Sequence, residues 1–225
     1  MNLAVDIGNT MVKWATYEGT TPTGHGTGLP GPEQLGADRA LVCASGALPP
    51  ELAALPRLEA GTALPIKLDY KTPATLGADR IAAACGAWAL HRGQASLVID
   101  AGTCITVDYL DAAGIYHGGA IMPGLTINLK ALHTFTDKLP LIDISNVAHA
   151  PVLGRSTEEC IVAGTLGATM LALAGFVALY REKSPGLNVL LAGGDAARLV
   201  AAGATAWEQV PQLTLIGLNE IMNNQ

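Results

Sequence analysis

One short pattern occurs twice in the sequence, and this repetition constrains the fold more than any other feature. Residues 3–10 read LAVDIGNT and residues 97–104 read LVIDAGTC. In each copy a short apolar run is followed by Asp-x-Gly and a small polar residue. A second β-prone stretch begins directly afterwards, at residues 11–16 and 105–109. Both segments therefore predict a β-hairpin with a glycine in its turn.

Two hairpins of this kind are suited to holding phosphate. A glycine in the turn lets a bulky anion approach the backbone N–H groups. The aspartate that ends each first strand, Asp6 or Asp100, can face a metal ion directly or through water. A single copy would be weak evidence, because Asp and Gly are common in ordinary turns. Two copies in similar contexts predict a phosphate clamp made of two facing hairpins.

The composition limits the classes of partner. The chain has 225 residues, enough for one large domain or two small ones, and half of them are hydrophobic. The net charge is −6 and no Lys/Arg cluster is present, which argues against nucleic acid as the main partner. Nucleotide binding is not excluded, because a few local donors suffice for it.

Cysteine and histidine spacing disfavours a zinc or histidine metal site. Cys43, Cys85, Cys104 and Cys160 lie far apart in the sequence, so we expect reduced thiols in a cytosolic protein. Neither HxxxH nor HExxH occurs, which leaves magnesium binding by aspartate open. No signal peptide is evident, and the expected location is cytoplasmic.

The order of predicted elements indicates an α/β protein with two related lobes, residues 1–93 and 94–225. Each lobe opens with one of the hairpins. The sequence predicts strands at 3–17, 41–45, 188–192 and 213–217, a loop at 20–31, and helices at 49–55, 77–91, 156–182 and 196–202.

Residues 161–180 form a run of twenty uncharged residues, which is the length of a membrane span. Alanine, glycine and threonine dilute its hydrophobicity, and the capping-box pattern Ser156-Thr157-Glu158-Glu159 precedes it. We therefore expect no membrane insertion. Because the run is apolar all round, we expect a helix buried between domains or between subunits.

A set of motifs extends over most of the chain. In order they are DIGNTMVK (6–13), PATLGADR (73–80), DAGTCITVD (100–108), GGAIMPG (118–124), GRSTEECIVAG (154–164) and LAGGDA (191–196). The paired hairpins resemble those of the actin, Hsp70 and sugar-kinase superfamily, in which two ribonuclease-H-like lobes close on ATP. The full set resembles the type III pantothenate kinases. Residues 18–60 carry no recognisable motif and are short for that family.

The resemblance implies that ATP phosphorylates the primary hydroxyl of pantothenate to give 4′-phosphopantothenate, the first step of coenzyme A biosynthesis. It also implies a cytoplasmic homodimer that needs Mg²⁺ with ATP and a monovalent cation, K⁺ or NH4⁺. Two other classes stay open. One is a non-catalytic regulator, since some homologues are named Bvg accessory factor; the other is an actin- or Hsp70-like ATPase.

The resemblance also assigns the nucleotide site. Asp6 would organise Mg²⁺, directly or through water, Asp100 would hold the monovalent cation, and Thr103 would contact ATP. Gly193 and Gly194 would flank the adenosine, although they could equally form a simple strand-to-helix turn. The first hairpin would line the phosphates with Asp6, Ile7, Gly8, Asn9, Thr10, Met11, Val12 and Lys13.

The acceptor site follows from the same resemblance. Asp79 would be the general base that accepts the hydroxyl proton, although a carboxylate at a helix start can simply complement the helix dipole. Arg80 could pair with a phosphate or the pantothenate carboxylate, or form a surface ion pair. Thr157 would contact pantothenate, and it or Ser156 would cap a helix. The expected pantothenate pocket consists of Tyr70, Gly77, Ala78, Asp79, Arg80 and Thr157.

Overall fold

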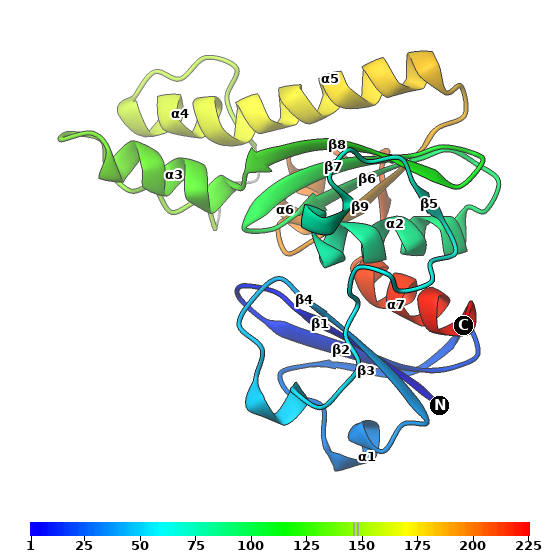
Figure 1. Cartoon of the computed structure of the whole chain (residues 1–225). Helices are drawn as coiled ribbons and strands as arrows, with labels where there is room; N and C mark the ends of the chain where they lie inside the picture. Colours follow the sequence, from blue (N-terminus) through cyan, green and yellow to red (C-terminus); the bar gives the residue numbers. More distant parts are fainter. Residues whose placement is uncertain (146, 148) are drawn as a thin grey trace. The chain divides into compact units, whose positions relative to one another are not determined.

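The computed structural model describes residues 1–145, 147 and 149–225 (Figure 1). The strands are β1 (Asn2–Ile7), β2 (Val12–Glu18), β3 (Thr21–Thr27), β4 (Arg39–Ala44), β5 (Lys67–Leu68), β6 (Ser96–Ala101), β7 (Cys104–Leu110), β8 (Ile115–Pro123), β9 (Asn188–Ala192) and β10 (Glu208–Gln209). The α-helices are α1 (Pro32–Leu35), α2 (Ala78–Leu90), α3 (Leu125–Thr134), α4 (Thr157–Val162), α5 (Ala168–Lys183), α6 (Ala196–Ala201) and α7 (Leu213–Asn223). Short 3₁₀ turns lie at Pro50–Leu52 and Pro73–Thr75, and a π-helical turn lies at Ala163–Gly167.

The two sheets repeat one strand order, which confirms the internal duplication predicted from the sequence. The first sheet has the order β3-β2-β1-β4. The second has the order β10-β9-β6-β7-β8-β5, so its central part, β8-β7-β6-β9, is the same arrangement with an extra strand at each edge. In the first sheet β2 pairs antiparallel with β1 and β3, and β4 pairs parallel with β1.

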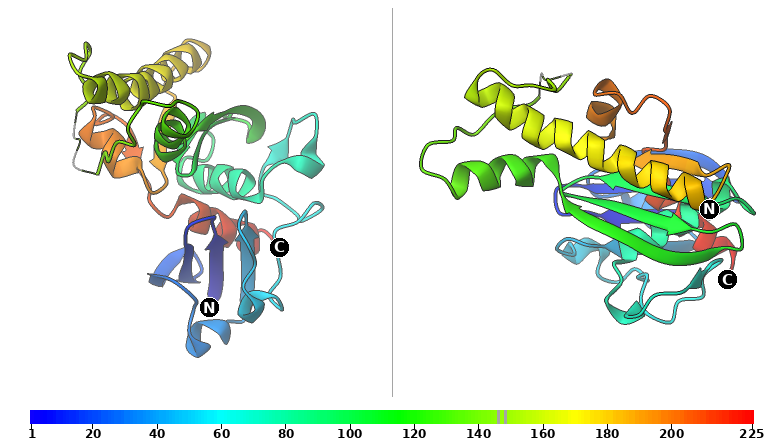
Figure 2. Two further views of the ribbon diagram at one scale, coloured as in Figure 1. Left: turned by 90° about the vertical axis from the view of Figure 1, so that its left-hand side faces the viewer. Right: turned by 90° about the horizontal axis from the view of Figure 1, so that it is seen from above.

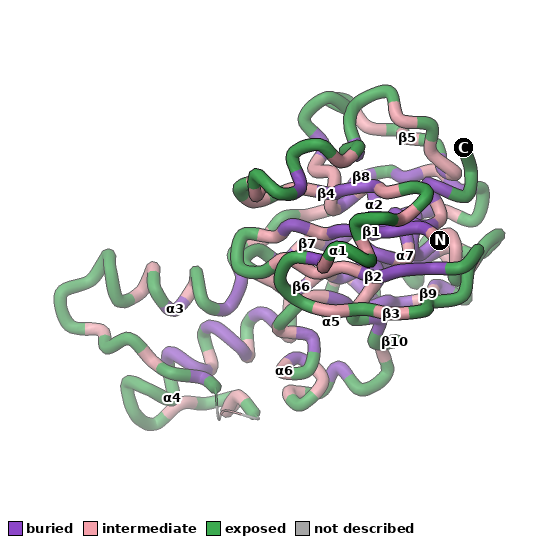
Figure 3. The backbone as a smooth tube through the Cα atoms, turned by 90° about the horizontal axis from the view of Figure 1, so that it is seen from below, coloured by how far each residue is buried: buried purple, intermediate pink, exposed green. Residues whose placement is uncertain are grey.

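The alternation of side chains along β1 sorts the residues between two apolar clusters. Leu3, Val5 and Ile7 are at most 1% exposed and pack in one cluster with Val42. Ala4, between them, belongs to another cluster that also contains residues of α2 and α7. This is the two-residue period of a strand buried on both faces. Within the first sheet, β1 is almost entirely buried and β2 is buried over Ala15–Tyr17, whereas β3 is exposed or intermediate (Figure 3).

The chain divides into two compact units. One contains residues 1–96, 108–118 and 212–225, and the other contains residues 97–107 and 119–211. The predicted lobes, 1–93 and 94–225, instead divide the chain once at the start of the second hairpin. The boundary between residues 93 and 94 therefore stays a prediction, based on where the second copy of the repeated pattern begins.

The expected loop at 20–31 is wrong over its first part, where β3 forms an edge strand. Its Thr, Gly and Pro composition is unusual for a strand. The reason lies in Trp14 of β2, because a Cβ built on Gly26 would lie 2.6 Å from the Trp14 ring. The glycine therefore makes room for the indole on the neighbouring strand, a positional role that glycine has in sheets.

The expected strand at 213–217 is also wrong, because these residues begin helix α7. This helix packs against α2 and β1, and most of its side chains are buried. Two glycines allow the backbones of α2 and α7 to meet. A Cβ on Gly217 would lie 1.7 Å from the carbonyl oxygen of Ala82, and one on Gly86 would lie 2.3 Å from that of Leu213. Tertiary packing thus overrides the β propensity of Leu-Thr-Leu-Ile.

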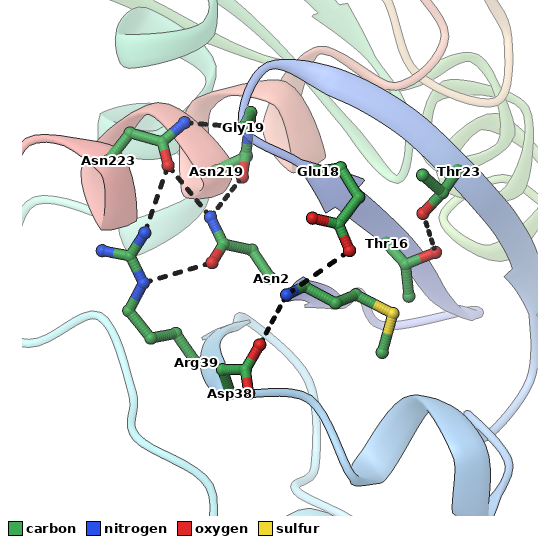
Figure 4. Close-up of polar contacts among 10 residues, drawn as sticks. Asn2, Thr16, Glu18, Gly19, Thr23, Asp38, Arg39, Asn219 and Asn223 are labelled. Carbon is green, nitrogen blue, oxygen red and sulfur yellow. Dashed lines mark hydrogen bonds and ion pairs between the residues drawn. The ribbon is translucent and has the colours of Figure 1, made fainter.

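A polar network attaches the C-terminal helix to the N-terminal strand (Figure 4). Asn2 Nδ2 donates to Asn219 Oδ1 at 2.9 Å and to Asn223 Oδ1 at 3.0 Å. Arg39 Nε donates to Asn2 Oδ1 at 3.2 Å, and its Nη1 donates to the Met222 carbonyl at 2.6 Å. Because Asn2 and Asn219 are buried, these bonds satisfy polar groups that would otherwise destabilise the core.

The predicted helix at 156–182 is present as α4 and α5, joined by the π-helical turn into one rod (yellow in Figures 1 and 2). It starts as expected, with Ser156 Oγ accepting the Glu159 N–H at 3.2 Å. In the turn, Thr165 Oγ1 donates to the Ile161 carbonyl at 2.8 Å. Residues 157–183 are long and apolar enough to span a membrane by length and composition alone.

One face of this rod is exposed within the single chain. Thr169, Leu173 and Val177 are buried, whereas Leu171 is 78% exposed and Leu179 is 59% exposed. The exposed face therefore consists of apolar and small side chains. We name it the α5 face; it comprises Gly164, Ala168, Leu171, Gly175 and Leu179.

Candidate active site

The first hairpin forms as predicted. Asp6 of β1 lies opposite Lys13 of β2, and the Gly8 N–H donates to the Met11 carbonyl at 3.1 Å to close the turn. Ile7 is buried, Asp6, Gly8, Val12 and Lys13 are intermediate, and Asn9, Thr10 and Met11 at the tip are exposed. The tip therefore presents its backbone and the side chains of Asn9, Thr10 and Met11 to solvent, which leaves its N–H groups accessible to an anion.

Residues 45–46, which the sequence analysis did not single out, support this turn. Ser45 N–H and Gly46 N–H both donate to the Ile7 carbonyl, at 2.9 and 3.0 Å. A Cβ on Gly46 would lie 2.4 Å from the Gly8 carbonyl oxygen, so only glycine fits there. The Ser-Gly pair after the buried strand β4 was the available signal, since such pairs often mark a close backbone approach.

Asp79 lies in the first turn of α2, as predicted. Gly77 is the N-cap residue, and Asp79 Oδ1 accepts the Arg80 N–H at 2.9 Å. A Cβ on Gly77 would lie 2.4 Å from Asp79 Oδ1, so the glycine leaves space for the carboxylate to fold back over the helix start. Asp79 is partly exposed. A carboxylate in the first helical turn complements the positive end of the helix dipole.

The guanidinium of Arg80 is bound inside the protein, so its alternative assignment to a surface ion pair is wrong. Arg80 is 8% exposed and Asp108 is 1% exposed. Arg80 Nη2 and Nε donate to Asp108 Oδ1 at 2.6 and 3.0 Å, and the Tyr116 hydroxyl donates to the same oxygen at 2.6 Å. Tyr70 is close by, its ring centroid 6.0 Å from Arg80 Cζ.

Burial and charge act together on these groups. Burial alone would lower the pKa of Arg80, but the hydrogen bonds and charge of Asp108 outweigh it and raise that pKa. Burial raises the pKa of Tyr116 strongly, and the Asp108 carboxylate adds to the rise. Arg80 is therefore a cation and Tyr116 a neutral hydroxyl throughout the physiological range.

In the other compact unit, the second hairpin lies beside the Gly193–Gly194 motif, which the resemblance had assigned to the same nucleotide site. Gly193 has φ +90°, and a Cβ on it would lie 2.2 Å from the Ala101 carbonyl oxygen and 2.5 Å from Asp100 Oδ1. The Asp195 N–H donates to the same carbonyl at 2.9 Å. The glycine thus brings the backbone after β9 directly against the aspartate of the second hairpin.

A further glycine, Gly124, lies against the turn of the second hairpin. The Gly124 N–H donates to the Thr103 carbonyl at 3.1 Å, and a Cβ on Gly124 would lie 2.3 Å from the Gly102 carbonyl oxygen. Thr103 itself is exposed, Asp100 is partly exposed, and Gly194 is exposed. The structure therefore brings Asp100, Thr103, Gly193 and Gly194 into one neighbourhood, as a nucleotide-binding role requires.

The remaining predicted residues lie on separate elements. Thr157 is the exposed first helical residue of α4, and Ser156, not Thr157, is the helix cap. Tyr70, Gly77, Ala78, Asp79 and Arg80 belong to the compact unit that holds the first hairpin, and Thr157 belongs to the unit that holds the second.

The donor chemistry fits magnesium better than a protein-caged metal. Among the described residues, no group of three or more His, Cys, Asp or Glu side chains could hold a metal ion. Mg²⁺ commonly binds through one or two carboxylates together with substrate phosphates and water. Asp6, at the end of β1 in the first hairpin, suits that kind of site.

Comparison with solved structures shows the fold. The chain is similar to a Baf family transcriptional activator from Campylobacter jejuni, with a TM-score of 0.62 and 19% identity over 98% of this chain and 96% of the other. It is also similar to a glucokinase from an Antarctic psychrotroph, with a TM-score of 0.53 and 13% identity over 100% and 99% of the two chains. These matches confirm the predicted fold class of actin, Hsp70 and the sugar kinases.

Sequence comparison then gives the family. The family model described as type III pantothenate kinase matches residues 51–179. A type III pantothenate kinase of Phocaeicola vulgatus is 39% identical over 211 residues, 87% of this chain and 86% of that protein. One from Cytophaga hutchinsonii is 41% identical over 162 residues, 72% of this chain and 68% of that protein. The chain belongs to the type III pantothenate kinase family, as its motifs predicted.

Proposed function

We propose that the protein transfers the γ-phosphoryl group of ATP to the primary hydroxyl of pantothenate and so catalyses the first step of coenzyme A biosynthesis. Membership of the type III pantothenate kinase family carries this proposal. The candidate base Asp79 and both hairpins of the expected phosphate clamp are present in the same chain. A non-catalytic regulator would not need that combination.

The proposed chemistry divides between the two hairpins and α2. Asp79 accepts the proton of the pantothenate hydroxyl, and the hydroxyl oxygen forms a bond to the γ-phosphorus. The bond from that phosphorus to the β–γ bridging oxygen breaks, and ADP leaves. Phosphoryl transfer depends mainly on positioning and charge neutralisation, and Mg²⁺ bound with ATP supplies part of the latter. Asp6 and the Gly8 turn orient the phosphates.

The pantothenate pocket is proposed to include Tyr70, Gly77, Ala78, Arg80 and Thr157. Gly193 and Gly194 are proposed to lie against the adenosine, because glycines leave a flat surface for a base.

An acceptor screen tests the identity of the phosphoryl acceptor. With purified protein, Mg-ATP and K⁺, ADP formation should require pantothenate. Glucose and N-acetylmannosamine, acceptors of sugar kinases with this fold, should not replace it.

We also propose that Asp100 holds a monovalent cation beside the triphosphate. Two negative groups close together repel unless a cation lies between them. Replacing K⁺ and NH4⁺ by tetramethylammonium should therefore abolish most activity, and Asp100→Ala should lower activity and remove the response to added K⁺. Steady-state rates over a KCl titration at constant ionic strength provide the measurement. Full activity of the wild type in tetramethylammonium alone would contradict a cation site.

The exposed apolar α5 face supports an isologous homodimer in which two copies of this face meet. Its small residues allow close helix approach, and its leucines supply apolar area. We therefore propose that the apolar helix of residues 157–183 is buried against a second copy of the chain.

The substitution Ala168→Glu should dissociate this dimer. Ala168 is exposed on the α5 face, so its replacement by glutamate places an unpaired charge in the contact, at a cost of roughly several kcal/mol. Ala201→Glu, at an exposed position on α6, is the matched control and should remain dimeric. Light scattering with sedimentation velocity measures the mass. A wild-type protein that is monomeric and fully active at assay concentration would rule the dimer out.

A further inference from the structure

Asp108, in the second hairpin, is a carboxylate to which the proposed chemistry assigns no role. It ends the run DAGTCITVD and lies within β7, where it is 1% exposed. A carboxylate so deeply buried is costly unless it is paired and hydrogen-bonded. Here Arg80 and Tyr116 supply that pairing from two other elements, α2 and β8.

The pairing fixes the orientation of the Arg80 guanidinium through two of its nitrogens. Its Nε lies 3.0 and 3.3 Å from the two Asp108 oxygens, and its Nη2 lies 2.6 Å from Oδ1. The Tyr116 hydroxyl, 2.6 Å from the same Oδ1, holds the carboxylate in turn. A planar guanidinium bound through two nitrogens has little freedom to rotate.

This arrangement adjoins the proposed acceptor site directly. Arg80 follows Asp79 in the chain, and the Arg80 N–H donates to Asp79 Oδ1 at 2.9 Å. On the other side, the rings of Tyr70 and Tyr116 lie 6.0 Å apart. A Cβ on Gly118 would lie 2.9 Å from the Tyr70 ring, so the glycine gives that ring its place.

We propose that Asp108 is a positioning residue that, with Tyr116, holds Arg80 and thereby sets the place of the Asp79 carboxylate and the Tyr70 ring. This inference rests on the proposed function, because it assigns Asp108 to the acceptor side of that same site. A fixed base and a fixed pocket wall lower the cost of ordering the site when pantothenate binds. Asp108 itself touches no reacting atom in this scheme.

A purely structural ion pair makes a different prediction. Buried ion pairs can be replaced without loss of fold, so they are weak evidence for a role in stability. If Asp108 served stability alone, its replacement would lower the melting temperature and leave the kinetics of the folded molecules unchanged. If it positions the acceptor site, the folded molecules should lose rate and pantothenate affinity while keeping ATP affinity.

The test compares Asp108→Asn with Asp111→Asn. Asp111 has the same side chain and lies in the turn between β7 and β8, where it bonds His117 and not Arg80. Rates are divided by the concentration of protein that binds a fluorescent ATP analogue, so that unfolded molecules do not contribute to the comparison. Asp108→Asn should lower kcat/KM for pantothenate about 10–100-fold, the scale of a hydrogen bond to a charged group, with KM for ATP unchanged. Asp111→Asn should match the wild type.

Tyr116→Phe provides a second variant that keeps the ring and removes only the hydroxyl. It should lower kcat/KM for pantothenate about 3–10-fold, because it removes one donor and leaves the ion pair. If Asp108→Asn does not fold, the kinetics of Tyr116→Phe alone test the positioning role. The double variant should lose less than the product of the single losses, because both act on one network.

The outcomes separate the positioning role from the proposed function. Folded variants with wild-type kcat/KM for pantothenate, beside an active wild type, would overturn the positioning role alone. Equal losses of ATP and pantothenate affinity would also overturn it. Absence of pantothenate-dependent ADP formation in the wild type would overturn the proposed function, and the positioning role with it.

Discussion

The variant Asp79→Asn is expected to lower kcat by about 10²–10⁴-fold, the usual effect of removing a general base. Asparagine keeps the size of the side chain and can still accept the Arg80 N–H, so the start of α2 should survive. It cannot take a proton from the pantothenate hydroxyl. The dissociation constant of ATP, measured by calorimetry, should stay close to the wild-type value, because the substitution leaves both hairpin turns, the proposed phosphate-binding elements, unchanged.

Asp38→Asn is the matched control for this prediction. Asp38 is exposed and pairs with the amino terminus at 2.6 Å, outside every proposed site. It should keep wild-type turnover. If Asp79→Asn also kept wild-type turnover, Asp79 would be a helix-start residue only and the proposed mechanism would be wrong.

The second large effect is expected from Gly217→Ala, which should destabilise the protein by about 3 kcal/mol, the upper end of the range for overpacking. The added methyl group would lie 1.7 Å from the Ala82 carbonyl oxygen, so α7 must move away from α2. A loss of that size lowers the melting temperature of a protein of this length by about 6–12 °C. Calorimetry or circular dichroism on heating provides the measurement.

Gly36→Ala is the control for that substitution. A Cβ on Gly36 meets its nearest atom at 3.5 Å, which is ordinary contact, so the melting temperature should change little. A Gly217→Ala protein as stable as the wild type would mean that α7 does not pack against α2 as closely as described.

The parts of the fold that follow local rules could be predicted from the sequence. The repeated Asp-x-Gly pattern gave both hairpins, and the alanine-rich run after Gly77 gave α2 nearly to the residue. The Ser156 cap was also readable, because a capping box depends on residues three positions apart. In each case the residues that determine the element lie within the element or within a few positions of it.

The parts that depend on distant packing could not be predicted. Residues 213–217 have the composition of a strand, and they are helical because Gly86 and Gly217 let α7 pack on α2. Likewise β3 looks like a loop until Trp14 is placed over Gly26. In both cases the structure depends on a packing partner that lies more than ten residues away in the chain.

The candidate site shows the same division. Motifs identified Asp79 and Asp100, but no local pattern pairs Arg80 with Asp108, which lies 28 residues away. The contact of Gly193 with Asp100 likewise joins residues that lie 93 positions apart in the chain. Motifs therefore predict which residues carry the chemical groups, whereas the hydrogen-bond and packing partners of those groups become known only from the folded structure.

The most direct test of pantothenate phosphorylation measures ADP and 4′-phosphopantothenate in the same reaction, with purified protein, Mg-ATP and K⁺, in the presence and absence of pantothenate. The predicted result is ADP formation that depends on pantothenate, with one molecule of 4′-phosphopantothenate, identified by mass, for each ADP. Equal ADP formation with and without pantothenate, and no phosphorylated product, would contradict it.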